Sequence, residues 1–76
     1  MQLSAREFQL LRFFLEHPGV PLSREELLRQ VWGFDATRFS RTVDVHVASL
    51  RQKLEGEPQE PRMFLTVRGV GYRFNP

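Results

Sequence analysis

The sequence predicts one small α+β domain in which three helices are followed by a C-terminal β-hairpin. Two Ser-x-x-Glu patterns, at Ser4 and Ser23, each stand directly before an apolar run, which is typical of a helix start. Valines and leucines recur at helical spacing over residues 41–55, and two β-prone runs flank a glycine-containing turn near the C-terminus. We assign residues 1–76 to one domain, since this length is near the lower limit for a single hydrophobic core.

Composition restricts the class of protein. The absence of cysteine excludes disulfides and thiolate metal sites, and a hydrophobic fraction of 41% is enough for a packed core. No apolar run approaches the roughly 20 residues that span a bilayer, and no signal-peptide pattern opens the chain. His17, His46 and the helix-start pair Glu25-Glu26 form no pattern of a catalytic or metal site. We expect a cytoplasmic protein that is not an enzyme and needs no cofactor, metal or membrane.

The first helix is predicted over about residues 4–17. Ser4 and Glu7 can satisfy each other's free backbone N–H groups in a capping box, and Pro18-Gly19 ends the helix. Phe13 and Phe14 are expected in the core rather than in a groove for a partner, because aromatic residues at helical spacing usually pack inward. The apolar surface of this helix is broad and comprises Phe8, Leu10, Leu11, Phe13, Phe14 and Leu15.

The second helix is predicted over about residues 23–32. Ser23 and Glu26 repeat the capping-box pattern, and Gly33 is the expected stop. The apolar face of this helix consists of Leu27, Leu28 and Val31. The following stretch, Phe34–Phe39, has no clear period and is predicted to be a loop carrying two aromatic residues.

The third helix, over about residues 41–55 with Ser40 as its N-cap, organises the rest of the chain. Its inward stripe is predicted to consist of Val43, Val47, Leu50 and Leu54, whose spacings are four, three and four. The opposite face carries small or hydrogen-bonding side chains and is edged by basic ones, and it comprises Val45, Ala48, Ser49, Gln52, Arg41, Arg51, His46 and Lys53. Such a face suits a helix in a DNA major groove, but an ordinary amphipathic surface helix is an equal alternative on this segment alone.

A hairpin is predicted over about residues 62–75, after a solvated acidic connector at 55–61. Gly69 and Gly71 could supply positive φ at its turn, while Tyr72 and Phe74 are expected to pack the hairpin onto the third helix. The order helix, helix, loop, helix, hairpin is that of a winged helix-turn-helix, with the 34–39 loop as an enlarged turn.

Positive charge is localised although the net charge is only +2. Residues 1–37 carry four arginines against five acids, whereas residues 62–76 carry three arginines and no acid. Within 38–61, three of the four acids lie beyond Lys53. The cations therefore gather on the third helix and the hairpin, as expected of a surface that attracts a polyanion. Asp44 cannot favour DNA by its charge, so we expect it to orient a neighbouring arginine or to accept from a cytosine amine.

Several blocks of the sequence together resemble the OmpR/PhoB family, the winged-helix output domains of two-component response regulators. The resemblance runs in register from residue 3 to 74. The blocks that carry it are Leu3-Ser4-x-x-Glu7-Phe8, Ser23-Arg24-Glu25, Val31-Trp32-Gly33, Arg41-Thr42-Val43-Asp44-Val45-His46-Val47 and Thr66-Val67-Arg68-Gly69-Val70-Gly71-Tyr72-Arg73-Phe74.

The resemblance implies transcription regulation by sequence-specific binding of double-stranded DNA within a phosphorelay. It places the third helix in the major groove and the wing at the minor groove, and it implies a receiver domain N-terminal to this chain. It further implies a monomer in isolation that binds tandem half-sites as a dimer, and a loop, Phe34–Phe39, that can touch RNA polymerase. The DNA-binding residues that it implies, with Ser49 added as a base contact, are Arg24, Trp32, Arg41, Thr42, Val45, His46, Ser49, Arg51, Lys53, Thr66 and Arg68.

Two departures from the family keep a second hypothesis open. Family members often have arginines at the positions of Ala48 and Ser49, and the family's N-terminal antiparallel sheet is lacking before Leu3. We expect a fragment or an unusually short member, less stable than the whole family domain. The alternative function is a winged-helix protein–protein interaction module that uses the 34–39 loop and the apolar surface of the first helix.

Overall fold

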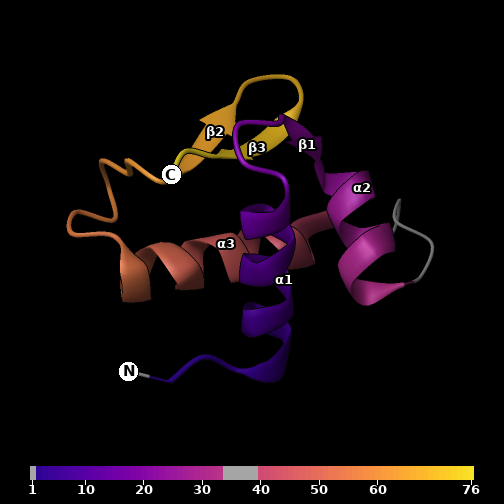
Figure 1. The fold of residues 1–76 in the computed structure, drawn as a ribbon, viewed down its shortest axis with the longest axis horizontal. Coiled ribbons are helices and arrows are strands. Elements are labelled where there is room, and N and C mark those ends of the chain that lie inside the picture. The colour runs from indigo at the N-terminus through magenta and orange to yellow at the C-terminus, as the bar shows by residue number, and fades with distance from the viewer. Residues whose placement is uncertain (1, 34–39) are drawn as a thin grey trace.

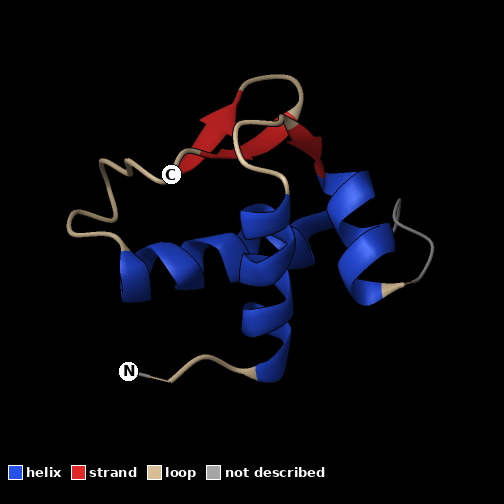
Figure 2. Ribbon diagram, in the orientation of Figure 1, coloured by secondary structure: helices blue, strands red, loops and turns tan. Residues whose placement is uncertain are grey.

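The computed structural model describes residues 2–33 and 40–76, and these two stretches form helices packed against one small antiparallel sheet (Figures 1 and 2). The predicted winged-helix fold is confirmed: helical segments precede a C-terminal hairpin. The elements in order are α1 (Ala5–Glu16), β1 (Leu22–Ser23), α2 (Arg24–Leu27), η1 (Leu28–Trp32), α3 (Ser40–Leu54), β2 (Phe64–Val67) and β3 (Gly71–Phe74). Within the described stretches, no helix has the length and apolar character needed to cross a membrane.

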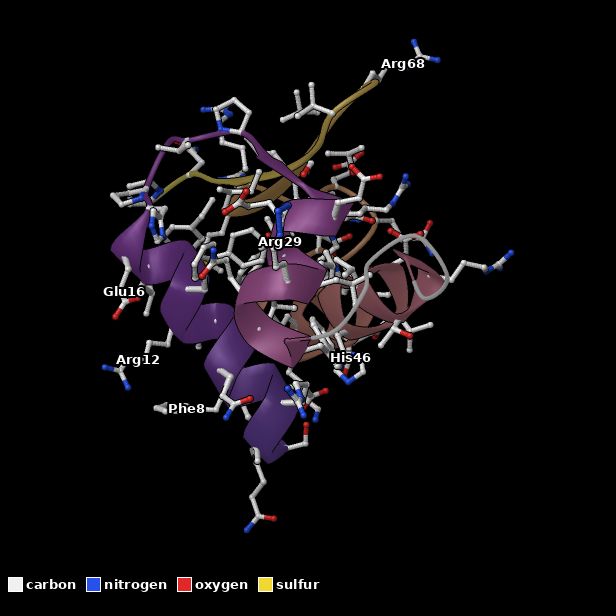
Figure 3. All side chains as sticks on the ribbon, turned by 90° about the vertical axis from the view of Figure 1, so that its right-hand side faces the viewer. Phe8, Arg12, Glu16, Arg29, His46 and Arg68 are labelled. Carbon is white, nitrogen blue, oxygen red and sulfur yellow. The ribbon has the colours of Figure 1, made fainter. Side chains whose placement is uncertain are left out.

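The capping box predicted for α1 is present. The Ser4 hydroxyl accepts from the Glu7 backbone N–H at 3.1 Å, and the Ser4 N–H donates to the Glu7 carboxylate at 2.7 Å. Phe14 is fully buried, as predicted, and Phe13 is partly buried against the core. Phe8 and Leu15 lie on the outer side of α1 with 57% and 54% of their surface exposed, and Figure 3 shows Phe8 pointing away from the other helices.

The second helix is a short α-helix that continues as a π-helix. Ser23 caps it by accepting from the Glu26 N–H at 2.9 Å. The reciprocal half of the predicted capping box is missing, and the Glu26 carboxylate lies 4.0 Å from Arg29. Gly33 ends the segment with φ at +79°, as predicted, and donates its N–H to the Leu28 carbonyl across the wide turn.

The sheet has the strand order β1-β3-β2, and its short strand β1 was not predicted. Leu22 pairs with Tyr72 and Ser23 with Gly71, so the start of α2 is attached to the hairpin. Gly69 has φ at +77°, as predicted, but Gly71 does not adopt positive φ. A Cβ at Gly71 would instead collide with the Leu22 carbonyl, so this glycine is required for the close approach of β1.

The predicted inward stripe of α3 is confirmed. Val43, Val47 and Leu50 are fully buried and Leu54 is partly buried. Ser40 is the first helical residue rather than the predicted cap, and the predicted loop 34–39 lies outside the described residues. The core that this stripe joins comprises Leu10, Phe14, Leu22, Leu27, Leu28, Val43, Val47, Leu50, Phe64, Tyr72 and Phe74, and it includes Tyr72 and Phe74 as predicted.

The connector after α3 is not wholly solvated, which corrects the prediction. Glu55 is buried, and its carboxylate accepts the backbone N–H groups of residues 62, 63 and 64 at 2.8–2.9 Å. Burial acts to raise the pKa of Glu55, but these three N–H groups outweigh it and hold the pKa below its ordinary value. Only the middle of the connector, with Glu57 and Glu60, is exposed. Glu55 therefore anchors the start of β2 to the end of α3.

Candidate nucleic-acid interface

The outward face of α3 is accessible, as the sequence predicted. Val45 is 64% exposed, and Arg41, Ala48 and Gln52 are exposed on the same side of the helix. Apart from Arg41, the side chains on this face are short or uncharged, so the surface of a partner could approach the helix backbone closely. The residues that edge this face are held by three clusters of contacts and by one aromatic pair.

The first cluster joins α2, α3 and β3 through Asp44. One oxygen of its carboxylate, Oδ1, accepts from Arg24 Nε at 2.7 Å and from the Tyr72 hydroxyl at 2.6 Å. Burial acts to raise the pKa of Asp44, but the bonds from Tyr72 and Arg24 outweigh it, so this pKa lies below its ordinary value. The bond to Asp44 raises the pKa of Arg24. Of the two roles predicted for Asp44, the structure contains the contact with a neighbouring arginine.

The second cluster joins α3 to the wing through Arg51. Its Nε and Nη2 atoms donate to the Phe64 carbonyl at 2.9 and 2.7 Å, and Nη2 also donates to the Thr66 hydroxyl at 2.9 Å. The guanidinium lies 5.6 Å from the centroid of the Tyr72 ring. Two predicted site residues, Arg51 and Thr66, are thus brought together, while the Nη1 atom of Arg51 takes no part in these bonds.

The third cluster binds the other edge of α3 to the start of α1. Lys53 Nζ donates to the Glu7 carboxylate at 2.7 Å and to the Gln2 carbonyl at 3.0 Å, and the Ser49 hydroxyl donates to the same carboxylate. The bonds from Lys53, Ser49 and the Ser4 N–H lower the pKa of Glu7 to about 2, in that order of effect. Ser49 and Lys53 were predicted as DNA contacts, and here both are engaged by a buried carboxylate that the sequence assigned to capping alone.

His46 and Trp32 also lie together, between α3 and η1. His46 Nδ1 donates to the Thr42 carbonyl at 2.8 Å, and the two rings meet edge to face with centroids 5.0 Å apart. The guanidinium of Arg6 lies 5.4 Å from the Trp32 ring, and its Nη1 donates to the Val31 carbonyl. Two predicted site residues are thus brought together, and an arginine that the sequence did not single out supports them.

The turn between β2 and β3 carries Arg68, one of the arginines of the wing. Arg68 is exposed and extends away from the body of the domain (Figure 3). A shallow cavity of about 330 Å³ lies between this turn and the start of α2, and Arg24, Thr66 and Arg68 are among its lining residues. Three predicted site residues from α2 and the wing thus share one basic recess.

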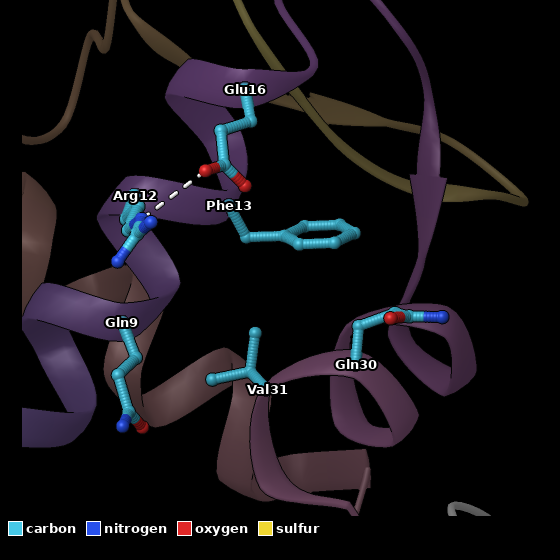
Figure 4. A pocket seen from close by; sticks show the side chains of 6 residues that line it. All are labelled: Gln9, Arg12, Phe13, Glu16, Gln30 and Val31. Carbon is cyan, nitrogen blue, oxygen red and sulfur yellow. Dashed lines mark hydrogen bonds and ion pairs between the residues drawn. The ribbon is translucent and has the colours of Figure 1, made fainter.

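A second recess, between α1 and η1, has no such character (Figure 4). It measures about 240 Å³, and Phe13 and Val31 form its apolar part. Its polar rim consists of two glutamines and the Arg12–Glu16 ion pair, which is 3.2 Å long and solvent-exposed. Within residues 2–33 and 40–76, no three side chains of metal-binding type gather closely enough to hold a metal ion.

The helices, the paired hairpin and the accessible α3 define this chain as a winged-helix domain. Residues 1–74 match the family described as "Transcriptional regulatory protein, C terminal", and the chain belongs to that family, which is of the OmpR/PhoB type. Among its relatives, the alkaline phosphatase synthesis transcriptional regulatory protein SphR of Synechococcus elongatus is 48% identical over 73 residues. The transcriptional regulatory protein YvrH of Bacillus subtilis is 47% identical over 73 residues. These alignments cover 96% of this chain but 28% and 31% of the relatives, so the chain spans less than a third of their length.

Solved structures agree with this assignment. The RstA DNA-binding domain of Klebsiella pneumoniae in complex with the RstA box superposes with a TM-score of 0.88 at 35% identity, covering 97% of this chain and 73% of that one. The DNA-binding domain of the response regulator AdeR, in complex with an intercistronic region, gives 0.81 at 38% identity, covering 100% and 74%. Both are similar to this chain over nearly its whole length.

Proposed function

We propose that this domain binds double-stranded DNA sequence-specifically as the output domain of a response regulator. α3 would enter the major groove and the β2–β3 wing would reach the adjacent minor groove. The observation that carries the proposal is the accessible outer face of α3, flanked on one side by the basic recess of Arg24 and Arg68. The complexes of the similar RstA and AdeR domains with DNA support it.

We assign three kinds of contact within this interface. Thr42 and Val45 would read base edges, with the Val45 methyls against a thymine methyl and Ser49 at the margin of the readout. Thr66 and Arg68 would enter the minor groove, whose negative potential is greatest where it is narrow. The remaining predicted residues would contact phosphates and fix the register; they are Arg24, Trp32, Arg41, His46, Arg51 and Lys53.

A binding assay in two stages tests this function. With about four to six phosphate contacts, the log–log salt dependence of binding should have a slope of about −4 to −5. Sites selected from a random DNA pool should then bind Thr42→Ala more weakly by about 1–3 kcal/mol, whereas unrelated duplexes should not distinguish this variant from the original. An equal loss on every sequence would reject base reading by Thr42.

The wing is tested by Arg68→Ala with Arg12→Ala as its matched control. Both changes remove one exposed cation, but Arg12 lies on α1, away from the wing (Figure 3). Arg68→Ala should weaken binding most on A·T-rich flanks, whose minor groove is narrow, and Arg12→Ala should have little effect. Equal effects of the two changes would mean that Arg68 acts only through net charge.

The partners of the whole regulator form part of the same proposal. We infer that a receiver domain precedes this domain, that the domain is monomeric alone and that two copies bind tandem half-sites. Contact with RNA polymerase would involve Phe34–Phe39, which lies outside the described residues. Sedimentation with duplexes carrying one or two half-sites tests the stoichiometry.

The alternative is a protein–protein module that uses the apolar outer side of α1 together with the 34–39 loop, which lies outside the described residues. The exposed Phe8 and Leu15 are what favour it. A gel-shift on random-sequence duplex at low salt separates the two functions, because even non-specific DNA binding should retard the duplex there. Absence of any retarded species would favour the protein partner.

A further inference from the structure

The corner where α2, α3 and β3 meet places one carboxylate beside a proposed phosphate contact. The β1–β3 pairing sets Leu22 opposite Tyr72, and Arg24 follows β1 directly as the first residue of α2. Arg24 is therefore held next to the hydroxyl of Tyr72, and Asp44 reaches both from α3. Three elements far apart in the sequence converge on one oxygen atom.

We propose that Asp44 is a positioning residue for DNA binding, which holds the Arg24 guanidinium in the orientation that meets a DNA phosphate. The inference rests on the proposed function. Arg24 uses Nε for Asp44, and the four N–H groups on its two Nη atoms are not part of that bond. Half of the Arg24 side chain is exposed, beside the recess that it shares with Thr66 and Arg68.

The hydroxyl of Tyr72 makes this arrangement rigid. It is fixed on a strand of the sheet, its ring is buried, and it donates to the same Oδ1 atom that accepts from Arg24. The rotamer of Asp44 is therefore set from β3, and the plane of the guanidinium is set from Asp44. An arginine whose plane is fixed before binding loses less side-chain entropy when a phosphate arrives.

The charge of Asp44 and its contact with Arg24 lead to opposite predictions for how removal of Asp44 changes DNA binding. By its charge alone, a carboxylate at the edge of the DNA-facing helix repels phosphates, so its removal should strengthen binding. As a positioning residue, its loss should weaken binding. Asp44→Ala and Asp44→Asn separate the two effects, because both remove the charge but only Asn retains an oxygen that accepts from Arg24 and Tyr72.

The experiment measures binding of the full chain to a mixed-sequence 20-base-pair duplex at low salt. Asp44→Ala should bind about threefold more weakly than Asp44→Asn, and the difference should vanish when Arg24→Ala is also present. Glu60→Gln, which removes one acid from the exposed connector, measures the effect of charge alone. If Asp44→Ala binds as well as Asp44→Asn, or if their difference persists without Arg24, the proposal is overturned.

Arg24→Lys provides a second test that does not require Asp44→Ala to fold. Lysine keeps the charge but lacks the planar fork that can engage Asp44 and a phosphate at once. Arg24→Lys should bind the duplex about threefold more weakly than the original chain, close to the binding of Arg24→Ala. Binding of Arg24→Lys equal to that of the original chain would overturn the proposal. If the original chain itself fails to retard the duplex, the proposed function fails instead.

Discussion

The Glu7 carboxylate should make the stability of this domain depend on pH below neutrality. Glu7 is buried, and the bonds from Lys53, Ser49 and the Ser4 N–H lower its pKa to about 2 from an ordinary 4.5. Since the folded pKa is depressed, the stabilisation is present above the unfolded pKa of 4.5 and is lost as the pH falls toward 2. Between pH 7 and pH 3 the loss should be about 2 kcal/mol.

That loss is large compared with the stability of a small domain. A chain of 76 residues is stable by roughly 4–11 kcal/mol. Glu7→Gln removes the titrating group, so it should cost about 3 kcal/mol at pH 7. At pH 3 it should cost about 2 kcal/mol less, because Glu7 of the original chain is then protonated in the unfolded state but still mostly ionised in the folded state. The bonds that this change removes join α1 to α3 and involve a buried carboxylate, unlike those of a surface ion pair.

Urea unfolding followed by far-UV circular dichroism at pH 7 and pH 3 measures this effect. Glu16→Gln is the matched control on the same helix, since its ion pair with Arg12 is exposed and should contribute less than about 1 kcal/mol. The original chain should lose more stability than Glu7→Gln between the two pH values, by about 2 kcal/mol. Equal losses in the two proteins would refute the role assigned to Glu7.

Three further changes test contacts that lie away from Glu7. Gly71→Ala should lower the free energy of unfolding by about 1–3 kcal/mol, because the added Cβ would meet the Leu22 carbonyl of β1. A Cβ at Gly56 would have open space, so Gly56→Ala is the control, and thermal melts compare the two variants. Glu55→Ala leaves three backbone N–H groups without their acceptor, so it should lower the free energy of unfolding by about 2 kcal/mol or more. The exposed Glu57→Ala is the control and should change the stability by about zero, and urea unfolding measures both. Arg51→Met keeps the apolar stem of the side chain but removes the hydrogen bonds from α3 to the Phe64 carbonyl of β2, so amide exchange in β2 should accelerate. Unchanged exchange would contradict this expectation.

Features that depend on neighbours in the sequence could be predicted well. The Ser4–Glu7 capping box spans four residues, and the buried stripe through Val43 and Val47 follows from helical period alone. The turn at Gly69 likewise follows from local backbone chemistry. These elements needed no knowledge of what packs beside them.

Features that depend on distant partners were missed. β1 is too short to show a strand period, and it exists because Tyr72 and Gly71 offer it a partner. Glu7 meets Ser49 across 42 positions, a contact that no spacing rule supplies. The burial of Glu55 similarly depends on how the chain returns to form β2. The candidate site was thus predicted as a list of residues, but the contacts that orient them were not.

The two contacts on Tyr72 have a consequence for the shape of duplex that this domain accepts. Arg51 lies over its ring and Asp44 holds its hydroxyl, so α3 and the wing keep a fixed offset from one another. If the domain binds as proposed, that offset matches the distance between the neighbouring major and minor grooves of B-form DNA. An A-form RNA duplex, whose major groove is deep and narrow, does not match this spacing whatever its bases.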